Sequence, residues 1–120
     1  MTVVERCIAK VDRAAVEREE RERIARATAE RIQFLYGRLF GNVVLSPDVR
    51  DLRTESQARE MFGLALNTAD NRLQVQILRV AVDNRWATVV NAFIKVWAGE
   101  HPISKTVQEL WDLTTGRASA

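Results

Sequence analysis

The side chains most capable of catalysis or metal binding are few and far apart in this sequence. It contains one histidine, His101, and one cysteine, Cys7, with no glycine-rich phosphate loop and no His-Glu-x-x-His motif. A histidine directly before a proline is typical of a solvated turn, and Cys7 is most simply a small apolar contact. Glu19 and Glu20 stand in a run of mixed charges, which is typical of a solvated helix face. We therefore expect no enzyme, no catalytic or metal-binding residues and no cofactor.

The overall charge indicates neither a nucleic-acid-binding patch nor a membrane segment. Lysine and arginine number 18 against 16 acidic residues, and both halves of the chain are nearly balanced. Proteins that depend on phosphate contacts usually show a basic patch or stripe. No apolar run approaches the roughly 18 residues that cross a bilayer, and Met1–Lys10 lacks the apolar core of a signal peptide. A single cysteine suits a reducing compartment. We expect a cytoplasmic protein without membrane association.

The spacing of apolar residues predicts a long first helix, from Thr2 or Glu5 to Phe40. Its segment Val16–Arg23 is polar on every side, whereas apolar residues recur every three or four positions from Ile24 onward. This contrast predicts a charged arm over about residues 1–26. Ion pairs between residues four apart are expected to support the arm: Glu17–Arg21, Glu19–Arg23 and Glu22–Arg26. Gly41 is expected to end the helix as a left-handed cap.

Further helix starts and stops follow along the chain. Ser46-Pro47-Asp48 has the pattern of a helix start, and Thr54 with Gln57 matches a capping box, so residues 47–67 form either one helix or two. Gly63 is expected to permit close packing. Residues 70–98 also form one helix or two, with Asp83–Asn84 as the preferred break. A last helix is expected over Ile103–Leu113, followed by a frayed tail at 114–120.

Together these patterns predict an all-α fold, a single domain over residues 1–120 that forms a bundle of four to six helices with a long N-terminal helix. The apolar faces of the central helices are wider than the stripe that one neighbouring helix covers. Either the first helix folds back over them or a second subunit does. We therefore favour a non-catalytic adaptor or regulator that binds a protein partner and forms a homodimer. The candidate interface residues are Ile32, Tyr36, Leu39, Trp86, Phe93 and Trp97.

An alternative is a DNA-binding regulator that resembles a helix-turn-helix in layout. Residues 61–82 predict a helix, a turn around Asn67-Thr68-Ala69, and a second helix from Asp70. The turn lacks the glycine often found in this motif, and the second helix is strongly apolar. Four polar side chains early in that helix are of types that hydrogen-bond base edges: Asn71, Arg72, Gln74 and Gln76.

Overall fold

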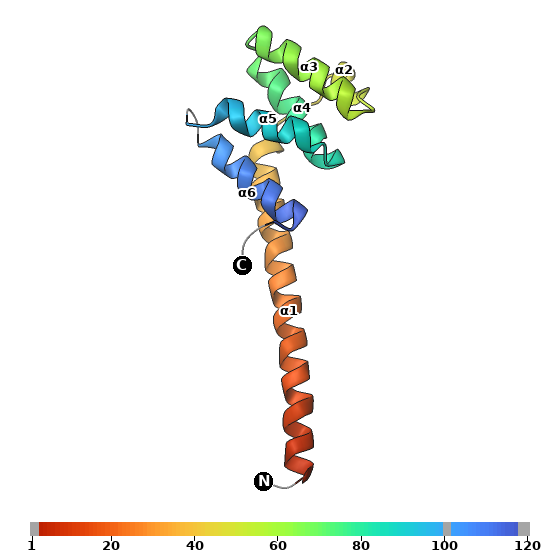
Figure 1. Cartoon of the computed structure of the whole chain (residues 1–120), viewed down its shortest axis with the longest axis vertical. Coiled ribbons are helices and arrows are strands. Elements are labelled where there is room, and N and C mark those ends of the chain that lie inside the picture. Colours follow the sequence, from red (N-terminus) through yellow and green to blue (C-terminus); the bar gives the residue numbers. More distant parts are fainter. Residues whose placement is uncertain (1–2, 100–101, 118–120) are drawn as a thin grey trace. The chain divides into compact units, whose positions relative to one another are not determined.

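The residues that the structure describes form six α-helices and contain no strand (Figure 1). The computed structural model describes residues 3–99 and 102–117, with only the backbone for residues 3–12. The helices are α1 (Val3–Phe40), α2 (Pro47–Arg50), α3 (Glu55–Asn67), α4 (Asn71–Asn84), α5 (Ala87–Trp97) and α6 (Ile103–Thr115). The predicted all-α class with a long N-terminal helix is confirmed.

The chain divides into two units, Met1–Gln33 and Phe34–Ala120, and the division falls within α1. In the first unit the described side chains, residues 13–33, are exposed except for half-buried Thr28 and Ile32. The three expected ion pairs do not form among these residues. Instead the Arg23 guanidinium lies 2.6 Å from the Glu20 carboxylate, three residues away, and both side chains are more than half exposed. An exposed pair of this kind adds little stability.

The second unit is a packed group of helices in which α4 and α5 are central. Helix α4 contacts α2, α3 and α5, and α5 contacts α3 and α6. Multiple neighbours explain why these two helices are apolar over wide faces. The fully buried side chains come from every helix after α1, the largest being Phe93, Ile77, Leu78, Leu110, Val49, Val89, Val90 and Val107. From α1 this unit buries Leu35 and Phe40.

Both segments for which one or two helices were expected form two. The Thr54–Gln57 capping box is present and starts α3, whereas Ser46 precedes α2 without a side-chain cap. Helix α4 ends because Arg85 adopts a left-handed conformation with φ 59°. The Trp86 N–H then donates to the Ala81 carbonyl at 2.8 Å, which reverses the chain toward α5. The break lies just after the expected Asp83–Asn84, both of which are still helical.

Two predictions about glycines are wrong. Gly41 does not adopt a left-handed conformation; a Cβ there would lie 2.4 Å from the Gly37 carbonyl oxygen, so steric space explains the residue. Gly63 does not serve close packing, because a Cβ at that position would meet no atom within 4 Å. Both predictions rested on the position of the glycine along a predicted helix. That position does not reveal the distances to neighbouring atoms in the fold.

The C-terminal helix is longer than expected. Helix α6 continues through Thr115 and ends at Gly116, which is left-handed with φ 73°. The predicted fray at Thr114 is therefore wrong, and residues 118–120 lie outside the described part of the chain. His101 and the side chain of Cys7 also lie outside it, so the predictions about those two residues remain predictions.

Candidate interaction surfaces

Tyr36, one of the predicted interface residues, is engaged within the second unit. Its hydroxyl donates to the Asp83 carboxylate at 2.9 Å and accepts from Arg79 Nε at 3.2 Å. Arg79 also donates to the Val43 carbonyl at 2.7 Å. Burial raises the pKa of the Tyr36 hydroxyl, and the Asp83 carboxylate adds to the rise while Arg79 opposes it. These contacts join the end of α1 to α4.

Trp97 and Phe93, two further candidates, also have neighbours within the chain. The Trp97 ring stacks on Phe93 with centroids 5.1 Å apart, and its Nε1 donates to Gln74 Oε1 at 3.0 Å. Phe93 is 0% exposed and also lies 6.3 Å from the Phe62 ring. Phe93 therefore has no surface to offer a partner in this arrangement. Of the four predicted aromatic interface residues, Phe93 belongs to the core.

The remaining candidates keep part of their surface accessible. Ile32, Leu39 and Trp86 are half-buried, as are Tyr36 and Trp97. Trp86 stands directly before α5 and its carbonyl accepts from the Val90 N–H at 3.2 Å. These side chains could add area to an interface, but none is a fully exposed aromatic anchor. Their role in association stays a prediction.

Helices α3 and α4 have the expected helix–turn–helix layout, with left-handed Ala69 (φ 52°) in the turn. Gln74 is 3% exposed and bonds to Trp97, so it faces the core. Gln76 is half-buried and accepts from the Ser46 N–H at 2.8 Å. Asn71 and Arg72 are exposed. Two of the four candidate base-contacting side chains are thus already used to hold the fold.

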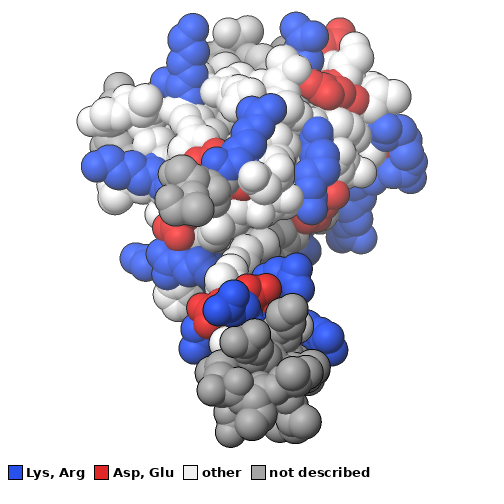
Figure 2. Space-filling model, turned by 60° about the horizontal axis from the view of Figure 1, so that its bottom comes forward, with Lys and Arg blue, Asp and Glu red and all other residues white. Residues whose placement is uncertain are grey.

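Charged side chains are mixed on the surface rather than segregated. On the face drawn in Figure 2, lysine and arginine side chains are scattered, with acidic and uncharged residues between them. A duplex backbone presents a continuous row of phosphates, and proteins that bind it gather their basic side chains. The face shown has no such gathering.

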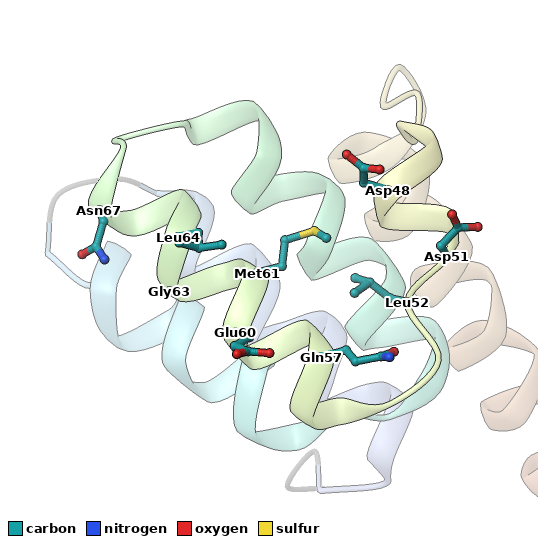
Figure 3. Close-up of a pocket in the computed structure, with 9 residues that line it drawn as sticks. All are labelled: Asp48, Asp51, Leu52, Gln57, Glu60, Met61, Gly63, Leu64 and Asn67. Carbon is teal, nitrogen blue, oxygen red and sulfur yellow. The ribbon is translucent and has the colours of Figure 1, made fainter.

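An open hollow of about 700 Å³ lies between α2 and α3 in the second unit (Figure 3). Its rim carries the carboxylates of Asp48, Asp51 and Glu60, and its apolar lining includes Met61 and Leu64, the latter 63% exposed. These residues give the hollow an acidic, partly apolar surface. No catalytic constellation accompanies it, because its remaining lining residues bring no nucleophile with an adjacent base.

The described side chains of residues 13–33 in α1 are exposed or half-buried, and this helical segment is here called the exposed α1 segment. Val16 is 59% exposed and Ile24 is 56% exposed. Arg18 and Glu22 have no hydrogen-bond or ion-pair partner within the described residues. The segment offers both apolar area and uncompensated charge.

The sequence did not predict the contacts that the polar side chains of α4 make. Arg79, Asp83 and Gln76 fall in one polar sector of α4, and that sector proves to hold the contacts to Tyr36 and Ser46. The sequence indicates these contacts only through a polar strip on an otherwise apolar helix. The hollow between α2 and α3 gave no comparable signal, because its residues are brought together by the turn between the two helices.

Within the described residues, no group of three or more histidine, cysteine, aspartate or glutamate side chains is placed to hold a metal ion. None of the helices there combines the length and apolar character required to cross a bilayer. No protein-family model matches the sequence, and comparison with curated proteins and with solved structures finds no match either. Any function must therefore be argued from this chain's own residues.

Proposed function

We propose that this chain is a non-catalytic cytoplasmic adaptor or regulator that binds protein partners, and that it forms a homodimer through the exposed α1 segment. One observation carries the proposal: each described side chain of residues 13–33 is exposed or half-exposed, although these residues form a regular helix. Among the described residues, the buried apolar side chains lie between Leu35 and Trp111.

A helix without tertiary contacts has limited stability in water. Most helical stability in proteins comes from packing one face against a neighbour, and isolated helices depend on propensity and side-chain pairs. The exposed α1 segment is rich in alanine, glutamate and arginine, which are good helix formers. The expected four-residue ion pairs, however, do not form within it. A partner helix would supply the missing contacts, and a second copy of the chain is present wherever the first is.

Light scattering over a hundredfold range of concentration tests the proposal. We expect the mass to rise from the 13.7 kDa of one chain toward twice that value. A mass that stays at 13.7 kDa throughout would remove the homodimer. A pull-down with the full chain would then ask whether a different protein occupies the segment, and failure to capture any protein would remove the adaptor role as well.

The DNA-binding alternative has less support. Asn71 and Arg72 remain exposed, and together with Gln76 and residues 42–44 they line a hollow of about 600 Å³. Gln74 faces the core and cannot reach a base edge without losing its bond to Trp97. If DNA were the target, duplex binding would fall steeply with salt and would weaken in Arg72→Ala. Absence of retention on duplex DNA at low salt removes this function.

A further inference from the structure

The exposed α1 segment has a face whose charges are complementary to the same face of a second copy running in the opposite direction. Ala15, Arg18, Glu22 and Ala25 are spaced three or four residues apart, so they lie on one side of the helix at about 100° per residue. All four side chains are exposed. This set is here called the α1 seam. Val16, Glu20 and Ile24 lie on the opposite side.

We infer that two chains pair their α1 seams as an antiparallel two-helix coiled coil centred on residue 20. In this register Arg18 of each chain faces Glu22 of the other, and Ala15 faces Ala25. Two ion-paired layers stand at the centre, and a layer of small residues flanks them on either side. The inference rests on the proposed self-association and adds the orientation, register and residues of the contact.

The charges select this register over its alternatives. A parallel in-register pair would place Arg18 against Arg18 and Glu22 against Glu22, which repels. An antiparallel pair shifted by one heptad would set each charge opposite a small or apolar residue, leaving it without a partner in the seam. Polar residues at core positions of coiled coils commonly specify register and orientation at some cost in stability. The small side chains of Ala15 and Ala25 allow the helices to approach closely enough for Arg18 and Glu22 to meet.

The spacing of the α1 seam continues along α1 after Ala25. Ala29, Ile32 and Tyr36 follow Ala25 at the same spacing of three or four residues. Ile32 and Tyr36 are already half-buried, whereas Ala25 and Ala29 are exposed. After Glu22, this side of α1 therefore carries small and apolar residues in sequence.

Charge reversal tests the register in the full chain. Arg18→Glu places Glu against the partner's Glu22 in both central layers, and we expect at least about a tenfold rise in the dimer dissociation constant. Arg18→Glu combined with Glu22→Arg restores opposite charges and should recover most of the affinity. Arg13→Glu is the matched control: it makes the same change of charge at an exposed residue of the same segment, lies on the side of the helix away from the seam, and should leave the dissociation constant within about twofold.

Cysteine cross-linking tests the orientation, with Cys7→Ser as background in every chain. Under mild oxidation, a mixture of Ala15→Cys and Ala25→Cys chains should form a disulfide-linked pair, while each alone should not. In the antiparallel register two copies of residue 15 are about 15 Å apart along the helix axis. Cross-linking of Ala15→Cys with itself, or a dimer that Arg13→Glu weakens as much as Arg18→Glu, would overturn this register and leave the proposed dimer standing. A chain that is monomeric at every concentration would overturn both.

Discussion

Residues 13–33 and residues 34–117 are both largely helical, but different interactions hold their helices. In the second range, the burial of apolar side chains holds the helices together, and Phe93, Val107 and Leu110 are fully buried. In the first, the helix rests on residue propensity and a single described salt bridge, Arg23–Glu20. The comparison teaches that a regular helix is not by itself a sign of a stable one. We expect a partner helix to add stability to the first range, and this expectation can be tested residue by residue.

The largest difference between the two regions should appear when large apolar side chains are removed. Phe93→Ala leaves a cavity beside Phe62 and Trp97 and should lower the free energy of unfolding by about 3–5 kcal/mol. Ile24→Ala removes an exposed side chain and should change it by less than about 0.5 kcal/mol. Urea unfolding of both variants at low protein concentration measures the contrast. Similar losses in the two variants would show that Ile24 is covered within the monomer.

Replacing two glycines of the second region with alanine should change the free energy of unfolding in opposite directions. Gly41→Ala forces a Cβ against the Gly37 carbonyl, so we expect a loss of about 1–3 kcal/mol. Gly63→Ala meets no atom and removes a flexible residue from the interior of α3, so it should stabilise by about 1 kcal/mol. Thermal unfolding of the pair checks both. A destabilised Gly63→Ala would mean that α3 packs more tightly than the structure shows.

The contact between the end of α1 and α4 should be visible in a titration. Tyr36 is the one tyrosine of the chain, so the absorbance change of tyrosinate reports it alone. Because the folded pKa is raised, its contribution to stability is complete below the unfolded pKa of about 10 and is lost as pH rises through the folded value. We expect a midpoint above 10 that falls to about 10 in denaturant. Equal midpoints would contradict the burial of the Tyr36 hydroxyl, which is the main cause of the raised pKa.

Removing the Tyr36 hydroxyl gives a second measure of the same contact. Tyr36→Phe leaves the Asp83 and Arg79 groups without this partner and should cost about 1 kcal/mol at neutral pH. The difference from wild type should shrink above the folded pKa, where the wild-type tyrosine is ionised beside Asp83. A variant that matches wild type at neutral pH would show that water replaces the hydroxyl without cost.

The smallest expected effects come from replacing one alanine with glycine in each of the two regions. Ala69 is left-handed in the turn before α4, so Ala69→Gly should stabilise by about 0.5 kcal/mol after the greater freedom of glycine in the unfolded chain is included. Ala27→Gly lies within the exposed α1 segment and should reduce helical circular dichroism without lowering the unfolding temperature of the second region. A lower unfolding temperature in Ala27→Gly would mean that the two regions unfold together.

Periodicity predicted the helices well because the second region follows one simple rule, the burial of one side of each helix. The capping box at Thr54 could also be predicted, because it depends only on residues that are close in sequence. The predictions for Gly41 and Gly63 were wrong because the roles of these glycines depend on distances to other atoms in the fold. Tyr36 and Trp97 were proposed as surface anchors, and the sequence could not show that Asp83, Arg79 and Gln74 would satisfy their polar groups inside the chain.

Backbone amide exchange of residues 13–33 as a function of protein concentration tests most directly whether a second copy stabilises this segment. The account predicts fast exchange in dilute protein and slower exchange as concentration rises, with the gain lost in Arg18→Glu and kept in Arg13→Glu. Residues within α4 and α5 should exchange slowly at every concentration. Strong protection of residues 13–33 that does not depend on concentration would contradict the account, because the helix would then be stable without a partner.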